Sequence, residues 1–246
     1  MKILSIVSVI LILAGILSCT SSTTKLDSDD NIVIPKKNLV ERTDTCGLII
    51  LYPVYEKVDL VCGTMPSQTD SSVLLCVEAC FTGECLNEFK HFNIAGDHVS
   101  GGTRYHGYKC KRNTGAFVFY NGAWKFLYKN YSDEMNIAAD NHGAAFAQEM
   151  IIHEGKIVET TRSNSNRNQF RALCQIDNRL CVIESANVLS FGDYKAKLNE
   201  IKVQEALYLD MGAGWNHAWY RTNVDSLTVL HPRTHNYCTN WITFYK

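Results

Sequence analysis

The chain has 246 residues, ten cysteines and a formal net charge of −1. The balanced charge, without a basic patch, argues against a nucleic-acid partner. Behind an N-terminal segment that is first apolar and then polar, the remaining roughly 205 residues fit one domain, or one domain with a subdomain.

The first residues predict export. Lys2 precedes an apolar run over residues 3–17, which is shorter than the roughly 20 residues that a membrane span needs. We therefore interpret residues 1–18 as a signal peptide. Cys19 follows the small residue Ser18, as in a bacterial lipobox, so we expect Cys19 to be lipidated and to hold the protein on a membrane surface. Cleavage as an ordinary signal peptide is the alternative.

A polar segment follows the signal sequence. Residues 19–44 are rich in Ser, Thr, Asp and Lys, a composition that cannot build a core, and we interpret them as a flexible tether. The domain is then expected over residues 45–246. An exported, lipid-anchored protein of this kind would lie in a bacterial cell envelope, facing the periplasm or the cell surface.

Nine cysteines remain after Cys19. An oxidising compartment would let some of them pair, and because nine is odd, at least one is expected to stay a thiol. Cys76, Cys80 and Cys85 do not have the spacing of a common zinc site, which favours a structural or disulfide use. Cys174 and Cys181 lie in alternating apolar runs and are expected to behave as small core residues.

The first half of the domain predicts strands. Residues 47–63 and 72–79 are rich in β-branched and aromatic residues and are bounded by Gly, Pro and Asp. The stretch 115–129 places two apolar runs on either side of Asn121-Gly122, the strongest short signal for a hairpin turn.

Further hairpins and one helix follow. We expect hairpin turns at Glu154-Gly155 and at Asp177-Asn178, because these residues tolerate a left-handed backbone. Residues 190–205 carry one apolar face at helical spacing, and a short apolar strand then ends at Asp210. A helix, a strand and then an acid followed by glycine is the layout of a mixed α/β fold. We therefore predict an α+β or mixed α/β class, with β-rich mixed sheets, hairpins and a few packed helices.

The stretch after that last strand is a candidate site. Asp210 at a strand end should lie near solvent, and Gly212 and Gly214 would let the backbone approach a ligand and offer N–H groups to an anion. An ordinary turn is the alternative.

Three other segments carry polar groups beside apolar runs. Arg171 opens a core strand and would grip a phosphate or carboxylate, with a surface strand cap as the alternative. Of Gln148 and Glu149, one is expected to face inward. Asp97 would orient His98 in an acid–base pair, with a turn acid beside an exposed histidine as the alternative. The spacing of Asp97 and His98 does not support a metal site.

The order of these segments resembles the phosphodiester glycosidase domain family, the family of the uncovering enzyme N-acetylglucosamine-1-phosphodiester alpha-N-acetylglucosaminidase. The run Arg171–Ile183 is similar to the family's R-T-A-I-G strand, turn and following strand. Ala206-Leu-Tyr-Leu-Asp210-Met-Gly212-Ala-Gly214 stands where the family carries A-L-N-L-D-G-G-G-S-S. Gln148–Gly155, Ala95–His98 and Asn240–Phe244 resemble three further family segments.

Several positions depart from the family pattern. The first Asn of the family's N-G-x-F-F loop is Ala95 here, and its paired aromatic residues are Asp97 and His98. Met211 replaces the first Gly after the acid, and Trp215-Asn216 replaces the two serines. The resemblance thus implies a retained fold with a reshaped substrate pocket.

The resemblance implies a hydrolase that cleaves a sugar–phosphate diester at the anomeric carbon. Asp210 would act as nucleophile or base, and Arg171 with the backbone near Gly212 would hold the phosphate. Asp97 and His98 complete the expected catalytic set, and Trp215 or Trp219 would stack on a sugar, with core packing as the alternative. The implied substrate-binding residues are Gln148, Glu149, Gly212, Gly214, Trp215 and Asn216.

The implied partners are a glycan or glycolipid with a phosphodiester-linked sugar, and a membrane through the lipid anchor. No cofactor is required by the pattern, and a divalent metal at the carboxylates is left open. Two other interpretations remain: a catalytically degenerate glycan- or anion-binding envelope lipoprotein, suggested by the replaced family residues, and a structural envelope lipoprotein without a small-molecule site.

Overall fold

The computed structural model describes residues 39–82, 93–212, 217–231 and 238–246. The chain divides into two units, residues 1–35 and 36–246, and the described residues belong to the second. Its first strand starts at Val40, inside the segment 19–44 that the sequence analysis assigned to the tether.

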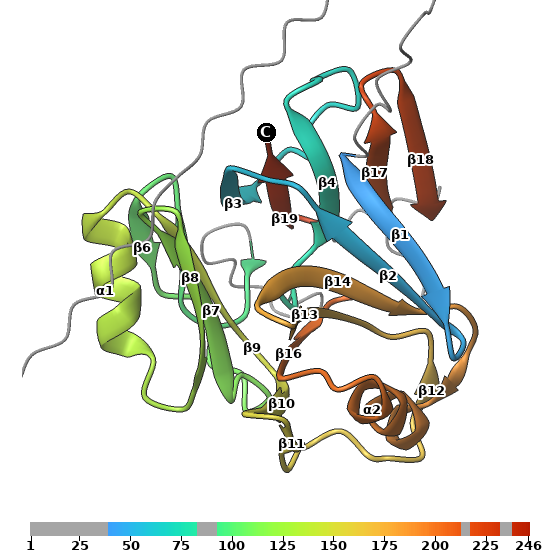
Figure 1. The fold of residues 1–246 in the computed structure, drawn as a ribbon. Coiled ribbons are helices and arrows are strands. Elements are labelled where there is room, and N and C mark those ends of the chain that lie inside the picture. The colour runs from blue at the N-terminus through green and yellow to red at the C-terminus, as the bar shows by residue number, and fades with distance from the viewer. Residues whose placement is uncertain (1–38, 83–92, 213–216, 232–237) are drawn as a thin grey trace, which may run out of the picture. The chain divides into compact units, whose positions relative to one another are not determined.

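A seven-stranded sheet forms the largest layer (Figure 1). Neighbouring positions in it are taken by strands that are distant in the chain. In spatial order its strands are β1 (Val40–Thr45), β2 (Leu48–Pro53), β14 (Arg179–Ser185), β13 (Arg171–Ile176), β16 (Glu205–Leu209), β10 (Met150–His153) and β11 (Lys156–Ile157).

Two five-stranded sheets and a short two-stranded ladder complete the β-structure. The second sheet is β18 (Ser226–His231), β17 (Ala218–Asn223), β4 (Val73–Glu78), β19 (Asn240–Tyr245) and β3 (Lys57–Cys62). The third sheet is β6 (Thr103–Tyr105), β5 (His98–Ser100), β9 (Ala144–Gln148), β7 (Gly115–Tyr120) and β8 (Ala123–Tyr128). The ladder pairs β12 (Arg167–Asn168) with β15 (Leu189–Ser190).

The predicted α+β or mixed α/β class is wrong. Every pairing between these strands is antiparallel, and the described residues form only two helices, α1 (Ser132–Asp140) and α2 (Phe191–Glu200). The helix–strand–acid pattern suggested a parallel crossover, but β16 lies antiparallel to both of its neighbours, β13 and β10. The fold is β-rich, with several antiparallel sheets.

All three predicted hairpins are confirmed. Asn121-Gly122 joins β7 to β8, Glu154-Gly155 joins β10 to β11, and Asp177-Asn178 joins β13 to β14. Both residues of each turn have positive φ, as a type I′ turn requires. In each case the turn dipeptide set the register of its hairpin.

The predicted helix is confirmed, although it is shorter than expected. Ser190 caps α2 by accepting a hydrogen bond from the Asp193 amide at 3.0 Å. The helix ends at Glu200, because Lys202 takes a left-handed conformation with φ of 62° that a helix cannot continue.

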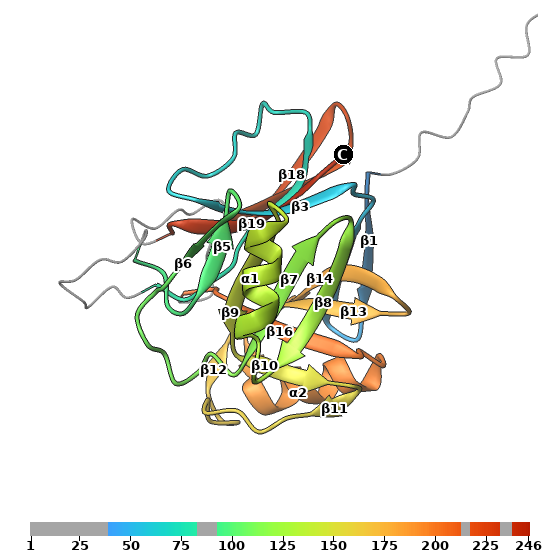
Figure 2. The ribbon, with the colours of Figure 1, turned by 90° about the vertical axis from the view of Figure 1, so that its left-hand side faces the viewer.

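The sheets share one core. Leu173 and Leu207 from the seven-stranded sheet, Val77 from the second and Phe117 and Phe146 from the third belong to the same buried cluster. The other face of the seven-stranded sheet packs on α2 through a second cluster, while α1 lies on the third sheet (Figure 2). Within the described ranges, neither helix has the length and apolar character to cross a membrane.

Candidate functional site

Strand ends of three sheets meet around the carbonyl of Ala79, directly after β4. The Asp210 amide, directly after β16, donates to this oxygen at 3.0 Å. The side-chain amide of Gln148, at the end of β9, donates to the same oxygen at 3.3 Å. Two of the predicted site residues are thus brought to one place by a single backbone group.

Arg171 lies at this same edge, because its cross-strand partner is Leu209, the residue before Asp210. Its side chain is fully buried. The guanidinium donates from Nε and Nη2 to one carboxylate oxygen of Glu184, at 2.9 and 2.7 Å. Glu184 is the direct partner of Arg171 across the β13–β14 hairpin.

Glu184 has a second partner at the end of β18. Its other carboxylate oxygen is hydrogen-bonded by Nε2 of His231, whose side chain is 13% exposed. A carboxylate that accepts from one imidazole nitrogen fixes the ring and leaves the other nitrogen for chemistry. We call Arg171, Glu184 and His231 the charged triad. In this triad, a buried ion pair is hydrogen-bonded to a histidine near solvent.

The charged triad keeps Glu184 ionised. Burial by itself raises the pKa of this carboxyl, but the Arg171 charge and the His231 hydrogen bond outweigh burial and lower the pKa below its ordinary value. His217, directly before β17, is a second nearby histidine that bonds Gln68 at 3.1 Å. Burial lowers the pKa of His217 and the Arg171 charge lowers it further, although a hydrogen bond with the His231 backbone opposes them.

Asp210 is partly exposed at this edge. One of its carboxylate oxygens accepts a hydrogen bond from the Gly212 amide at 2.9 Å, and the Gly212 carbonyl accepts from the Asn168 side chain at 3.1 Å. Gly212 has φ of 51°, so the turn uses the backbone freedom expected there. The Asp210 carboxylate therefore lies in the turn after β16 and not inside the sheet.

Several predicted residues lie outside the described part of the chain: Cys19, Gly214, Trp215 and Asn216. Trp219 is described and is fully buried against Cys76 and Trp241, so the core-packing alternative for this tryptophan is confirmed.

Gln148 and Glu149 are both fully buried. Glu149 lies on the α2 side of the seven-stranded sheet, where its carboxylate is 3.5 Å from Nε of Arg162. The Arg162 guanidinium lies 4.4 Å from the ring centre of Tyr208 and 5.4 Å from that of Phe191. Cation–π contacts of this kind hold a guanidinium in an apolar place.

Asp97 and His98 do not form the expected pair. Asp97 instead accepts from Nη2 of Arg104 at 2.5 Å and from Nδ1 of His106 at 3.1 Å, and these partners hold the pKa of Asp97 below its ordinary value although burial opposes them. His98 is buried and stacks on Tyr105. Consecutive residues at a strand start point to opposite faces, which separates the two side chains.

Eight cysteines are described, and all eight are free thiols. Cys85 lies outside the described residues. Cys174 and Cys181 are cross-strand partners in the β13–β14 hairpin and are fully buried, which confirms their core role. Among the described residues, no cluster of three His, Cys, Asp or Glu side chains is arranged to hold a metal ion.

Glu184 and His231 were not predicted from the sequence. Glu184 had a usable signal, because a two-residue turn at Asp177-Asn178 pairs position 171 with position 184. His231 had none, since β18 reaches the triad only through its pairing with β17.

Comparison with known proteins supports the fold. The chain is similar to the catalytic domain of zebrafish N-acetylglucosamine-1-phosphodiester alpha-N-acetylglucosaminidase, solved as a form auto-inhibited by its pro-peptide. The TM-score is 0.52 at 10% sequence identity, over 84% of this chain and 81% of that one. A hypothetical protein from Synechocystis aligns with a TM-score of 0.47 at 11% identity, over 84% of this chain and 61% of that one.

No family model and no curated protein matches the sequence. The structural likeness to the zebrafish domain extends over most of both chains. The protein therefore has a phosphodiester glycosidase-like fold.

Proposed function

We propose that this protein is a hydrolase that cleaves a sugar–phosphate diester at the anomeric carbon. The observation that carries the proposal is the meeting of Asp210 and the charged triad at one edge of the seven-stranded sheet. The fold shared with the zebrafish phosphodiester glycosidase domain supports the same reaction class.

Asp210 is the proposed nucleophile or base. It is partly exposed, and the Gly212 amide holds one of its oxygens, so its carboxylate has a fixed direction. A carboxylate beside the anomeric carbon either attacks it or activates a water molecule. The leaving phosphate is already a weak base, which lowers the need for a strong acid.

His231 is the proposed acid–base partner. Glu184 fixes its ring, and Arg171 fixes Glu184 through two hydrogen bonds to one oxygen. Arg171 thus acts as a positioning residue in this proposal, because its buried guanidinium reaches the reaction through Glu184. Its charge also adds positive potential at the edge where the phosphate would lie.

The experiment is an assay of the full chain with sugar 1-phosphodiesters, in which released free sugar is measured. We expect turnover by the wild type and at least about a hundredfold lower kcat/KM for Asp210→Asn. Asp140→Asn, at the exposed end of α1, is the matched control and should keep the wild-type rate.

The alternative function has its own outcome. If no donor is hydrolysed but the chain binds the same phosphodiesters, the protein is a glycan- or anion-binding module and the hydrolase proposal is wrong. Full activity of Asp210→Asn would contradict the role given to that carboxylate.

Export and a lipid anchor at Cys19 are proposed on the sequence alone. The apolar run over residues 3–17 and the small residue before Cys19 support them. Incorporation of a fatty-acid probe by the wild type and loss of incorporation in Cys19→Ser is the expected result. Labelling that survives this substitution would contradict the assignment.

A further inference from the structure

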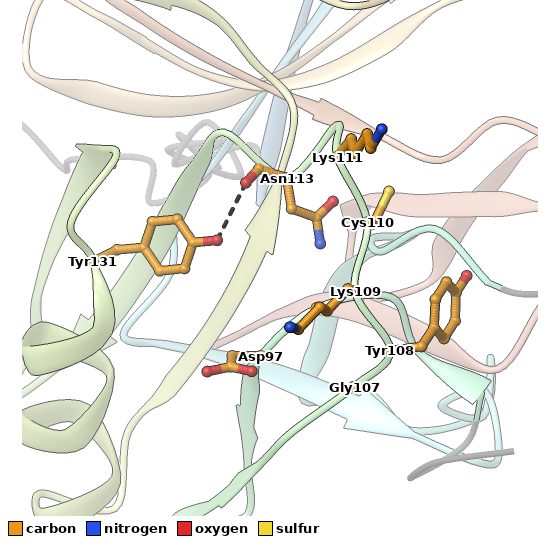
Figure 3. A pocket seen from close by; sticks show the side chains of 9 residues that line it. Asp97, Gly107, Tyr108, Lys109, Cys110, Lys111, Asn113 and Tyr131 are labelled. Atoms are coloured by element: carbon orange, nitrogen blue, oxygen red, sulfur yellow. Dashed lines mark hydrogen bonds between the residues drawn. The ribbon is translucent and has the colours of Figure 1, made fainter.

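A pocket of about 360 Å³ is lined by segments that connect elements of the third sheet, and neither Asp210 nor Gln148 lines it. This volume falls within the range of small-molecule sites. Its wall is made of residues 107–111 and Asn113, together with Gly96, Asp97 and Tyr131 (Figure 3). The pocket and the charged triad have no residue in common.

The pocket carries an excess of positive charge. Its acid, Asp97, already forms an ion pair with Arg104 and a hydrogen bond with His106. Lys109 and Lys111 line the same pocket, and neither forms an ion pair with a described residue. Figure 3 shows the Lys109 amine on the side of Asp97 and Tyr131, with the Lys111 amine directed away.

Backbone donors add to this charge. The amides of Lys109, Cys110 and Lys111 donate no hydrogen bond to any residue of the described chain. Consecutive amides without an acceptor, beside an ammonium group, are available to donate to a multi-oxygen anion. The surrounding wall is held in place, because Asn113 donates to the Ala95 carbonyl at 2.8 Å and Tyr131 donates to the Asn113 carbonyl at 3.2 Å.

We propose that this pocket binds the phosphate group of a small phosphomonoester, with Lys109 as the charged contact and the 109–111 amides as neutral donors. A phosphate has enough oxygens for both kinds of donor, whereas a carboxylate has two. The pocket volume leaves room for a compact group attached to the phosphate.

Calorimetric titration of the full chain at low salt tests this proposal, with inorganic phosphate, glucose 1-phosphate and acetate as probes. We expect both phosphates to bind more tightly than acetate. Lys109→Glu should weaken phosphate binding at least about tenfold, since a charge-assisted hydrogen bond is lost and a repulsive charge is added. Lys109→Arg should bind within a few-fold of the wild type.

One control locates the binding: Lys156→Glu changes an exposed lysine of β11 and should leave the affinity unchanged. Thermal unfolding of Lys109→Glu should match the wild type, because this side chain is exposed. The proposal is overturned if neither phosphate binds, if Lys109→Glu binds as the wild type does, or if Lys156→Glu causes the same loss.

Discussion

The seven-stranded sheet holds a buried guanidinium–carboxylate pair on each of its two faces, and the two pairs differ in construction. Arg171 makes two hydrogen bonds of 2.9 Å or less to Glu184, on the face that packs against the other sheets. The Arg162 guanidinium contacts Glu149 at 3.5 Å, on the α2 face, and lies against aromatic rings, while the Arg162 backbone amide donates to Glu149 at 3.3 Å.

The difference shows what each pair contributes. The Arg171–Glu184 pair is hydrogen-bonded to His231, so it orients a histidine that lies near solvent. The contacts of Arg162 are mostly with rings, and these anchor the segment before β12 onto α2 and the sheet. We infer that the Arg171–Glu184 pair orients a catalytic histidine and that the Arg162–Glu149 pair stabilises the packing of α2 on the sheet. Breaking each pair in turn tests this division of roles.

The largest expected effect is on stability when the first pair is broken. Arg171→Met leaves the Glu184 carboxylate buried without its main counter-charge, and should lower the free energy of unfolding by about 3–5 kcal/mol. Urea denaturation measures this loss. A loss below that of the Arg162 variant would remove the distinction between the two faces.

The same pair predicts a pH dependence. The folded-state pKa of Glu184 lies below its ordinary value of 4.5, so the stabilisation is fully present above that value and is lost as the pH falls through the lower, folded-state pKa. Glu184→Gln should therefore be much less stable than the wild type at pH 7. The difference between the two, measured by denaturation from pH 7 to pH 3, should shrink below pH 4.5. A constant difference would show that Glu184 is not ionised in the folded protein.

Breaking the second pair should cost less. Arg162→Met should lower the free energy of unfolding by about 2 kcal/mol, because cation–π contacts and long hydrogen bonds are lost. Glu149 keeps the Thr161 hydroxyl as a partner, and the nearby Lys195 ammonium interacts favourably with it. Urea denaturation measures the loss in the free energy of unfolding for Arg162→Met, and a loss equal to that of Arg171→Met would contradict the account.

The smallest effect is expected at the surface. Arg179 and Glu41 form a pair of 2.7 Å whose side chains are 49% and 45% exposed. Water and salt screen such a pair, so Arg179→Ala should change the free energy of unfolding by less than about 1 kcal/mol. A larger change would mean that burial is not what separates the three pairs.

The local parts of the fold could be predicted from the sequence. Asn121-Gly122 and Asp177-Asn178 dictate their hairpins through the backbone angles that they accept, and Ser190 marks the start of α2. The class was predicted wrongly, because which strands become neighbours depends on contacts between distant segments. The pairing of β4 with β17 and β19 is of this kind, and no turn residue signals it.

Only part of the candidate site could be predicted, because some of its residues are brought together by contacts between distant segments. Asp210 and Gln148 were identified from polar residues at the ends of apolar runs, and Glu184 follows from counting the register of a hairpin that had been predicted. His231 lies across the β17–β18 hairpin from Ala218, and the place of that hairpin depends on the long-range pairing of β17 with β4. The Asp97–His98 interpretation failed because neighbouring side chains at a strand start diverge, and Asp97 found Arg104 across the β5–β6 hairpin region instead.

The most direct test of the central claim compares three variants on one substrate, the methyl phosphodiester of N-acetylglucosamine 1-phosphate, with released sugar as the readout. His231→Ala should lower kcat/KM at least about a hundredfold. Arg162→Met should keep the wild-type kcat/KM at a temperature where it is folded, as should His153→Ala, which breaks another His–Glu pair, with Glu205. Equal losses in all three variants, or full activity of His231→Ala, would contradict the account.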